Sequence, residues 1–299
     1  MNVYDLPRLA SRDAYESAVA SYVAAVAPRA SAVYQVGNLT YPGLSDIDLL
    51  VVPDRPRADN QYYYSASARV PRPYEPFFLH EPFVVPQTVA DVMRYTTHAH
   101  RRLLAGTDVL SAQVPTDDPD AAWCRVLESY CAYASYAART RAGRTLNGRW
   151  CIAIASAMRF FLIDFDRIFS TSYSQSYARS IDAIRATAFE GDVRDAILCA
   201  WEQFIATFDV AERNLAHHLG VDEASLCAAA RGLLSGGRRR DAIARYHDEL
   251  ERFGFPYGHV FLVAAYDDAV RTVRPPPYAR YVCRNYYRIQ RRLRGHAHV

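Results

Sequence analysis

The chain has 299 residues, of which 51% are hydrophobic and 22% charged, and its formal net charge is +3. This composition is that of a globular protein and excludes a disordered or fibrous one, and the length suits two domains of modest size. The small net charge does not demand a nucleic-acid partner. All 35 basic residues are arginine, so any phosphate clamp here must consist of guanidinium groups, which bind phosphate bidentately.

The cysteines and the apolar runs indicate where the protein resides. Six cysteines are scattered without a CxxC pair, which argues against a zinc site or a secreted disulfide framework and for reduced thiols. Residues 1–30 mix charged residues with alanine and predict an amphipathic helix instead of a signal peptide. The most apolar helical run, 151–163, contains Arg159 and is too short to span a bilayer. The sequence therefore predicts a cytoplasmic protein without a membrane partner.

The first part of the chain alternates helix and strand patterns. Residues 10–27 carry apolar side chains at three- and four-residue spacing, which predicts a helix. Residues 31–36 and 47–52 are rich in β-formers and bounded by glycine and proline, so they predict strands. The segment 53–76 is rich in proline, tyrosine and arginine, and it is too polar and too interrupted by proline for a core. Its three consecutive tyrosines, 62–64, are candidates for contact with a second substrate.

The pattern changes after this segment. Residues 77–85 (FFLHEPFVV) predict a third strand, with Pro82 at an edge or a bulge. Residues 87–105 predict a helix and residues 108–114 a short strand. Beyond Pro115 nearly every segment has helical periodicity. The helices that we expect cover about 119–140, 149–168, 174–189, 192–218, 222–234, 238–253 and 257–273.

Together these patterns predict an α+β fold with two domains. A small mixed β-sheet module occupies residues 1–115, and an all-helical domain that ends in a basic, tyrosine-rich tail occupies residues 116–299. No internal repeat, Walker loop or Rossmann glycine fingerprint is present.

The stretch VGNLTYPGLSDIDLLVV, residues 36–52, places two acids one residue apart at the start of an apolar strand. Asp46 and Asp48 therefore project from one face of that strand, where neighbouring carboxylates repel each other unless a cation lies between them. Hard divalent ions such as Mg²⁺ prefer carboxylate oxygens and usually arrive with a phosphate-bearing substrate. Gly37 ends the preceding strand and permits close backbone approach. The stretch predicts a metal site; the alternative is a simple turn with an edge aspartate.

This order of residues resembles the signature of the polymerase-β-like nucleotidyltransferase superfamily, in which an apolar strand ends in Gly-Gly or Gly-Ser and an acidic pair opens the next strand. The matching residues are Gly37, Asn38, Ser45, Asp46 and Asp48, and the resemblance covers about residues 30–85. It implies that the two aspartates bind one or two Mg²⁺ ions that bridge a nucleoside triphosphate and an attacking hydroxyl. It also implies that Gly37, Asn38 and Ser45 lie at the phosphates.

The same family places a third carboxylate on a later strand. Glu81, an acid within an apolar run where a charge is costly, is the candidate for this metal ligand and for activation of the acceptor. In a regular strand its neighbour His80 points to the other face. Asp91 and Asp108 are the alternatives.

In the family the helical domain often closes over the triphosphate, which makes arginines of that domain candidate phosphate ligands. The turn RTRAGRTLNGRW, 139–150, supplies Arg144 and Arg149 as candidates, together with Arg139 and Arg141. The alternative is a solvated connection between two helices. Arg101 and Arg102 compete for the same role.

The resemblance implies an Mg²⁺-dependent nucleotidyltransferase that moves a nucleoside monophosphate from a nucleoside triphosphate to an acceptor hydroxyl or phosphate. The near-neutral charge favours a small molecule or a protein as acceptor over RNA. Asn38, where the family commonly has serine, and a loop at the short end of the family range depart from the signature. These departures leave open a catalytically inactive nucleotide-binding or scaffold protein on the same fold.

Two further segments suggest RNA. Residues 212–222 (ERNLAHHLGVD) are similar to the Arg-x4-His motif of HEPN RNases, in which Arg213 and His218 would cleave RNA by acid–base chemistry; the alternative is a helix end capped by Gly220. The tail 278–299 interleaves tyrosine with arginine, which suits single-stranded RNA. Its arginines also recur every four residues, which equally predicts an ordinary surface helix.

Overall fold

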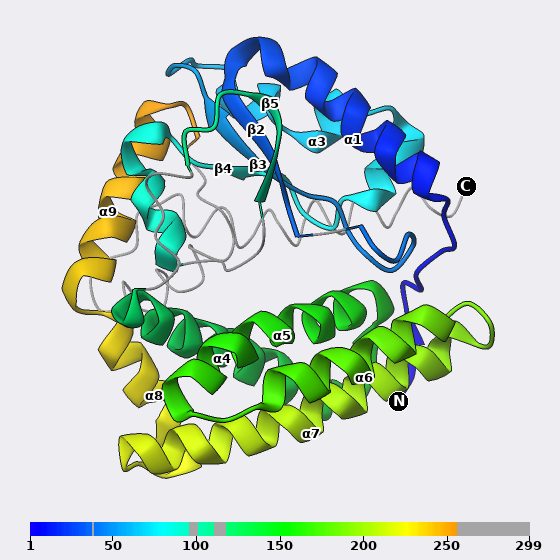
Figure 1. The fold of residues 1–299 in the computed structure, drawn as a ribbon, viewed down its shortest axis with the longest axis vertical. Helices are drawn as coiled ribbons and strands as arrows, with labels where there is room; N and C mark the ends of the chain where they lie inside the picture. Colours follow the sequence, from blue (N-terminus) through cyan, green and yellow to red (C-terminus); the bar gives the residue numbers. More distant parts are fainter. Residues whose placement is uncertain (38, 96–100, 111–117, 256–299) are drawn as a thin grey trace.

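The computed structural model describes residues 1–37, 39–95, 101–110 and 118–255. Within these ranges the chain has two large hydrophobic cores, one around a small mixed β-sheet and the other inside a bundle of long helices (Figure 1). The α+β class predicted from the sequence is confirmed. In this part of the chain, no helix is both long enough and apolar enough to cross a membrane.

The larger sheet has four strands in the order β4-β3-β2-β5. Its centre is formed by β2 (Ala30–Val36) and β3 (Asp48–Pro53), which pair antiparallel and agree with the two strands predicted there. β5 (Arg101–Gly106) adds antiparallel to β2, and β4 (Phe83–Val84) adds parallel to β3. Both faces of the central strands are covered. Their sequences are therefore continuous apolar runs and do not alternate between apolar and polar residues.

Helix α1 (Arg12–Val26) packs against this sheet, as the periodicity predicted. It begins after Ser11, whose hydroxyl accepts a hydrogen bond from Ala14 N, and it buries one apolar stripe in the sheet core. A short 3-10 helix, η1 (Ala27–Arg29), joins it to β2. Further short helices lie between β3 and β4; they are α2 (Asn60–Tyr63), α3 (Ala66–Arg69) and the 3-10 helix η2 (Arg72–Phe77).

The prediction that segment 53–76 stays outside the core was wrong. Tyr63 and Tyr64 are buried. The Tyr63 hydroxyl donates to the carbonyl of Ala25 at 2.7 Å, and the Tyr64 hydroxyl donates to the carbonyl of Arg29. A tyrosine whose hydroxyl reaches a backbone carbonyl packs in a core without leaving a polar group unsatisfied. Buried in this way, neither ring is open to a substrate.

The predicted helix over 87–105 was wrong in its second half. Gln87–Tyr95 forms the 3-10 helix η3, whereas the residues from Arg101 onward form β5 on the edge of the sheet. Pairing with β2 outweighs the local helical pattern, because edge hydrogen bonds satisfy the backbone of both strands. Residues 108–110 are not a strand, and the rest of the predicted strand, 111–114, lies outside the described residues.

The second core belongs to the helix bundle, whose helices agree with the predicted ones to within three residues at each end. Their bounds are α4 Pro119–Gly143, α5 Gly148–Phe169, α6 Tyr173–Thr187, α7 Val193–Leu219, α8 Glu223–Leu234 and α9 Gly237–Arg252. Gly220 caps α7 with φ of +65°, as predicted. The predicted helix 257–273 and the tail 278–299 lie outside the described residues.

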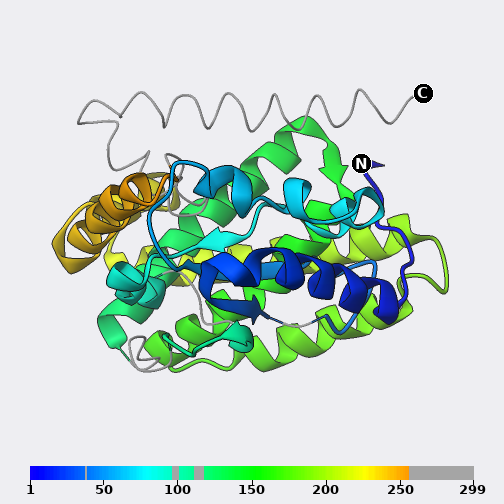
Figure 2. The same cartoon turned by 90° about the horizontal axis from the view of Figure 1, so that it is seen from above.

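Two segments cross between the cores. β1 (Asn2–Tyr4) pairs in parallel with β6 (Thr145–Asn147), directly before α5, and thereby joins the helical core. Helix α9 lies along one side of the molecule and reaches from the bundle to the sheet (Figures 1 and 2), where Tyr246 and Leu250 enter the sheet core. The boundary expected near residue 115 falls outside the described residues, so the division into 1–115 and 116–299 stays a prediction.

Candidate metal centre

The acidic pair lies where a loop enters the sheet. Asp48 is the first residue of β3 and pairs with Val36, the last residue of β2, so the two ends of the intervening loop meet at one edge of the sheet. Ile47, between the two acids, is buried, whereas Asp46 and Asp48 are only partly buried. This alternation places both carboxylates on the side away from the sheet core.

Contacts from both halves of the molecule hold this loop. The Tyr15 hydroxyl of α1 donates to the Ser45 carbonyl at 2.6 Å and accepts from Gly43 N at 3.1 Å. From the bundle, Arg185 of α6 donates to the Ser45 hydroxyl at 2.7 Å. Gly43 has φ of +91° and a Cβ there would collide with the Arg8 carbonyl, so only glycine fits this turn. The residue just before Asp46 is thus fixed from two sides.

The structure brings His80 to the acidic pair. Its Nε2 lies 2.7 Å from Asp48 Oδ1 and 3.7 Å from Asp46 Oδ2. The three residues form a group whose ligand atoms all lie within 4.8 Å of one another. The expectation that His80 faces away was wrong because it assumed a regular strand over 77–85. Residues 78–82 form no strand, so the alternation of strand side chains does not apply there.

The Glu81 carboxylate accepts hydrogen bonds from the start of α3 in this structure. The donors are Ser65 Oγ at 2.9 Å and Ala66 N at 2.5 Å. Glu81 is not part of the group that Asp46 and Asp48 form with His80. The third position beside the acidic pair therefore belongs to a histidine here, and the assignment of Glu81 as a metal ligand stays a prediction.

Two arginines of the helix bundle, Arg149 and Arg185, lie near enough to the acidic pair for their charges to act on Asp46. Arg149, in the first turn of α5, donates to the Pro76 carbonyl, and its charge acts on Asp46. The Arg185 side chain is only 4% exposed and lies over the Tyr41 ring, 4.5 Å from its centre. Arg185 Nε is buried and makes no hydrogen bond to any described residue. Burial, and next the charge of Arg159, lower the pKa of Arg185 to about 10.

Burial and neighbouring charges shift the pKa values of Asp46 and His80. Burial, and next the charge of Asp48, raise the pKa of Asp46 to about 7. Burial alone would lower the pKa of His80, but the hydrogen bond to Asp48 and the charges of both aspartates raise it to about 9. At neutral pH a protonated His80 thus occupies the place that a cation would take between the carboxylates.

The other predicted site residues are distributed as follows. Gly37 has φ of +71°, a left-handed conformation that favours glycine, and its role at a phosphate stays a prediction. Asn38 lies outside the described residues. Arg144 ends α4 in an exposed left-handed conformation, and its carbonyl accepts from Asn2 N. No described contact brings Arg144 to the acidic pair.

Three of the remaining candidates, Arg102, Arg141 and Asp108, bond to other residues. Arg102 donates to Gln35 Oε1 at 2.8 Å on the sheet, and Arg141 pairs with Asp209 at 2.6 Å. Asp108 accepts from the Tyr34 hydroxyl. Arg101 is partly buried on the edge strand, and Arg139 is exposed.

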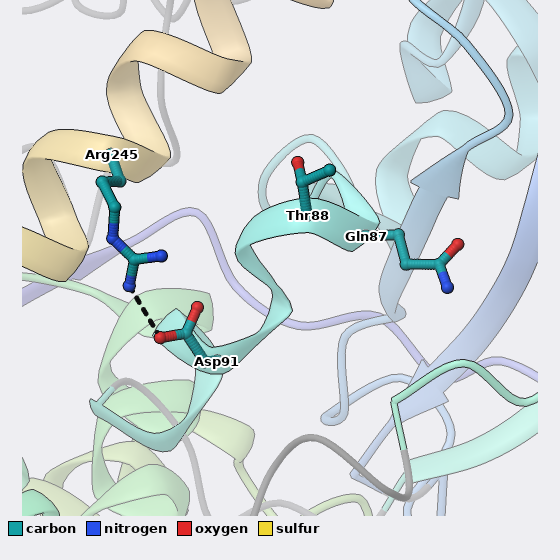
Figure 3. A pocket seen from close by; sticks show the side chains of 4 residues that line it. All are labelled: Gln87, Thr88, Asp91 and Arg245. Atoms are coloured by element: carbon teal, nitrogen blue, oxygen red, sulfur yellow. Dashed lines mark hydrogen bonds and ion pairs between the residues drawn. The ribbon is translucent and has the colours of Figure 1, made fainter.

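A pocket lies elsewhere, between η3 and α9. It is open, measures about 640 Å³, and is lined by Gln87, Thr88, Asp91 and Arg245 (Figure 3). Asp91 and Arg245 form an ion pair of 2.8 Å across it. None of the residues of the acidic site lines this pocket, and the Asp91 carboxylate is ion-paired with Arg245.

His218 and Arg213, the residues of the RNase motif, are exposed on α7. The His218 ring packs edge-on against Phe169 and Trp123, with ring centres 4.9 and 5.6 Å apart. RNA cleavage by these two residues stays a prediction.

Besides His80, the sequence did not indicate Arg185, which lies beside the acidic pair. Tyr177, Ile181 and Arg185 follow one another at four-residue spacing and form the buried stripe of α6. A charged residue in an otherwise apolar stripe is costly unless it has a specific partner. A charged residue in an apolar stripe was therefore the feature of the sequence that could have indicated Arg185.

Comparisons of the chain with protein-family models, with curated proteins and with solved structures found no match. What the fold and the site define is an α+β protein whose candidate cation site lies between a mixed sheet and a helix bundle.

Proposed function

We propose that this chain is a divalent-cation-dependent nucleotidyltransferase. It moves a nucleoside monophosphate from a nucleoside triphosphate to an acceptor hydroxyl or phosphate and releases pyrophosphate. The observation that supports the proposal most is the Asp46–Asp48 pair at the start of β3, next to the Gly37 turn and to Ser45, whose hydroxyl accepts from the buried Arg185. Carboxylates for a cation and guanidinium groups for phosphate oxygens are what a metal–triphosphate complex requires.

The residues present fit a divalent ion. Two carboxylates that repel each other, with the pKa of Asp46 raised to about 7, mark a place where a cation would relieve the repulsion. Arg185, which donates to the adjacent Ser45, also has a buried Nε for which the described residues offer no acceptor, and a phosphate oxygen would satisfy it. The site thus offers ligands for both parts of the complex.

In this proposal Asp46 and Asp48 hold Mg²⁺ or a related ion. When bound, the ion would neutralise the triphosphate and favour the ionised form of the acceptor hydroxyl. Gly37 and Ser45 lie on the phosphate side, and Arg149 and Arg185 bind phosphate oxygens from the bundle. The acceptor oxygen bonds to the α-phosphorus as the bond to the leaving pyrophosphate breaks.

The acceptor that we propose is a small molecule or a protein, because a net charge of +3 provides little attraction for a long polyanion. We place the reaction in the cytoplasm, where nucleoside triphosphates are available. The free state of all five cysteines in the described part of the chain is consistent with a reducing compartment.

Transfer of labelled nucleotide tests the proposal. The full chain is incubated with each α-labelled nucleoside triphosphate, Mg²⁺ or Mn²⁺, and sets of hydroxyl-bearing small molecules or proteins, and both labelled acceptor and pyrophosphate are measured. We expect both products with the native protein and neither with Asp46→Asn. Cation-dependent nucleotide binding without pyrophosphate release, for every nucleotide and acceptor, would support the inactive scaffold instead.

Replacing Arg185 with glutamine will weaken nucleotide binding without affecting the cation. We expect the affinity for a nucleoside triphosphate analogue to fall by about ten- to a hundredfold, because one charged hydrogen bond to phosphate contributes about 1.5–3 kcal/mol. The affinity for Mn²⁺ alone should change less than about threefold. Calorimetric titration measures both quantities.

Arg179→Gln is the matched control, since Arg179 is exposed on the same helix. It should bind the analogue as the native protein does. Equal effects of the two substitutions would show that Arg185 does not contact the triphosphate.

A further inference from the structure

We infer that the cation site takes a first-row transition ion in preference to Mg²⁺, with His80 as its nitrogen ligand. The inference rests on the proposed cation site at Asp46 and Asp48 and specifies which ion that site selects. Three features of His80 support it, namely the position of one ring nitrogen, the hydrogen bond of the other, and the packing of the ring.

The first feature is the position of Nε2. It lies 2.7 Å from Asp48 Oδ1 and 3.7 Å from Asp46 Oδ2. Two ligand atoms at right angles around an ion, each about 2.1 Å from it, are about 3 Å apart. The separation of Nε2 from Asp48 is thus close to the one that a shared ion requires, and the separation from Asp46 would have to shorten by about 0.7 Å. All three ligand atoms lie within 4.8 Å of one another, so one ion can reach them after a modest side-chain shift.

The second feature is the other ring nitrogen. His80 Nδ1 lies 2.8 Å from the carbonyl oxygen of Glu81. A carbonyl oxygen only accepts, so Nδ1 must carry the proton and donate it. This is the outer hydrogen bond that metal-bound histidines usually make, because it fixes the tautomer and directs the lone pair of Nε2 to the ion once the cation has displaced the Nε2 proton to solvent.

The third feature is the packing of the imidazole. The side chain is only 9% exposed, and its ring packs against Phe83 with ring centres 5.0 Å apart. A ring held by packing on one side and by a backbone carbonyl on the other is pre-oriented toward the carboxylates. Displacing it on cation binding would break both contacts.

These features determine the class of ion. Mg²⁺ prefers oxygen ligands and binds imidazole poorly, whereas the first-row transition ions accept mixed nitrogen and oxygen ligands. Two carboxylates and one imidazole carry two negative charges, one fewer than three carboxylates would. The site therefore attracts a hard ion such as Mg²⁺ less strongly than three carboxylates would. It also offers a nitrogen ligand, which a transition ion binds well. Mn²⁺ is a suitable probe because it is paramagnetic and tolerates the same octahedral geometry as Mg²⁺.

Pulsed electron paramagnetic resonance of the full chain with one equivalent of Mn²⁺ tests the inference directly. We expect a hyperfine coupling to a directly bound ¹⁴N nucleus, which disappears in His80→Asp. Calorimetric competition gives the second readout. The ratio of Mg²⁺ to Mn²⁺ dissociation constants should fall at least about tenfold in His80→Asp, because that substitution creates an all-carboxylate site.

His217→Asp is the control, since His217 is exposed on α7 and its substitution should leave both readouts unchanged. Mn²⁺ bound through Asp46 and Asp48 without nitrogen coupling would overturn this inference and leave the proposed function intact. Failure of the native protein to bind either ion would overturn both. The spectrum of the native protein decides the matter even if His80→Asp does not fold.

Discussion

The metal-free protein will lose stability as the pH rises from about 4 to about 9, and a divalent cation will restore it. The folded-state pKa of His80 is about 9 against an ordinary value of 6.5, and that of Asp46 is about 7 against 3.8. Between these values the folded state binds more protons than the unfolded state, so stability falls with rising pH. The His80 contribution is complete below about pH 6.5 and lost as the pH passes about 9. The Asp46 contribution is lost earlier, as the pH passes about 7.

The double substitution Asp46→Asn with Asp48→Asn will remove this behaviour. Without metal at about pH 9, we expect the variant to melt about 2–4 °C above the native protein, because a partly buried like-charged pair is gone and this contributes on the order of 1 kcal/mol. Millimolar Mn²⁺ should raise the melting temperature of the native protein and leave that of the variant unchanged.

Thermal melts of the full chain at several pH values, with chelator or with cation, measure this effect. Asp54→Asn is the control, since Asp54 is exposed directly after β3 and should preserve the native pH dependence and the cation response. A native melting temperature that is flat across the window, or a cation response that survives in the double variant, would contradict the assigned site.

Asp164→Asn will strongly destabilise the helix bundle. Asp164 of α5 is 1% exposed and accepts two hydrogen bonds from Arg125 of α4, at 2.8 and 3.0 Å. Arg125 also donates to the carbonyl of Arg94 in η3, so the pair joins the bundle to the sheet module. Loss of the carboxylate leaves a buried guanidinium charge uncompensated, and we expect the free energy of unfolding to fall by about 3–5 kcal/mol.

The exposed pair of Arg141 with Asp209 provides the matched comparison. Its distance is similar, at 2.6 Å, but both side chains are about one third exposed or more. Asp209→Asn should therefore cost less than about 1 kcal/mol. Chemical unfolding monitored by circular dichroism measures both variants. A loss in Asp164→Asn no greater than that in Asp209→Asn would show that burial does not strengthen the inner pair.

The long helices could be predicted because their signals are local. Asp118, Asn147, Asp192 and Asp222 each cap the helix that follows, with side-chain oxygens that accept from the first turn. Periodicity then continues each helix without reference to the rest of the chain. β5 carries no comparable local signal, because it becomes a strand only through pairing with β2, far away in the sequence. Tyr63 and Tyr64 of segment 53–76 likewise enter the core only through carbonyls supplied by distant residues.

The candidate site was predictable to a similar extent. The acidic pair follows from two carboxylates at the start of one strand, and its spacing alone sets both on one face. That His80 lies beside the pair could not be predicted, because its direction depends on whether residues 78–82 form a regular strand. No sequence motif could predict the contact between Arg185 and Ser45, because the two residues are 140 positions apart in the chain.

Binding of a non-hydrolysable nucleoside triphosphate analogue to the full chain, measured by calorimetry with and without a divalent cation, tests the proposed cation site most directly. We expect binding in Mn²⁺ or Mg²⁺ that weakens at least about a hundredfold in chelator, and the same loss in the Asp46→Asn, Asp48→Asn variant with cation present. Equal affinity with and without the cation, or in the native protein and the variant, would contradict the role of Asp46 and Asp48 as the metal ligands that hold the triphosphate.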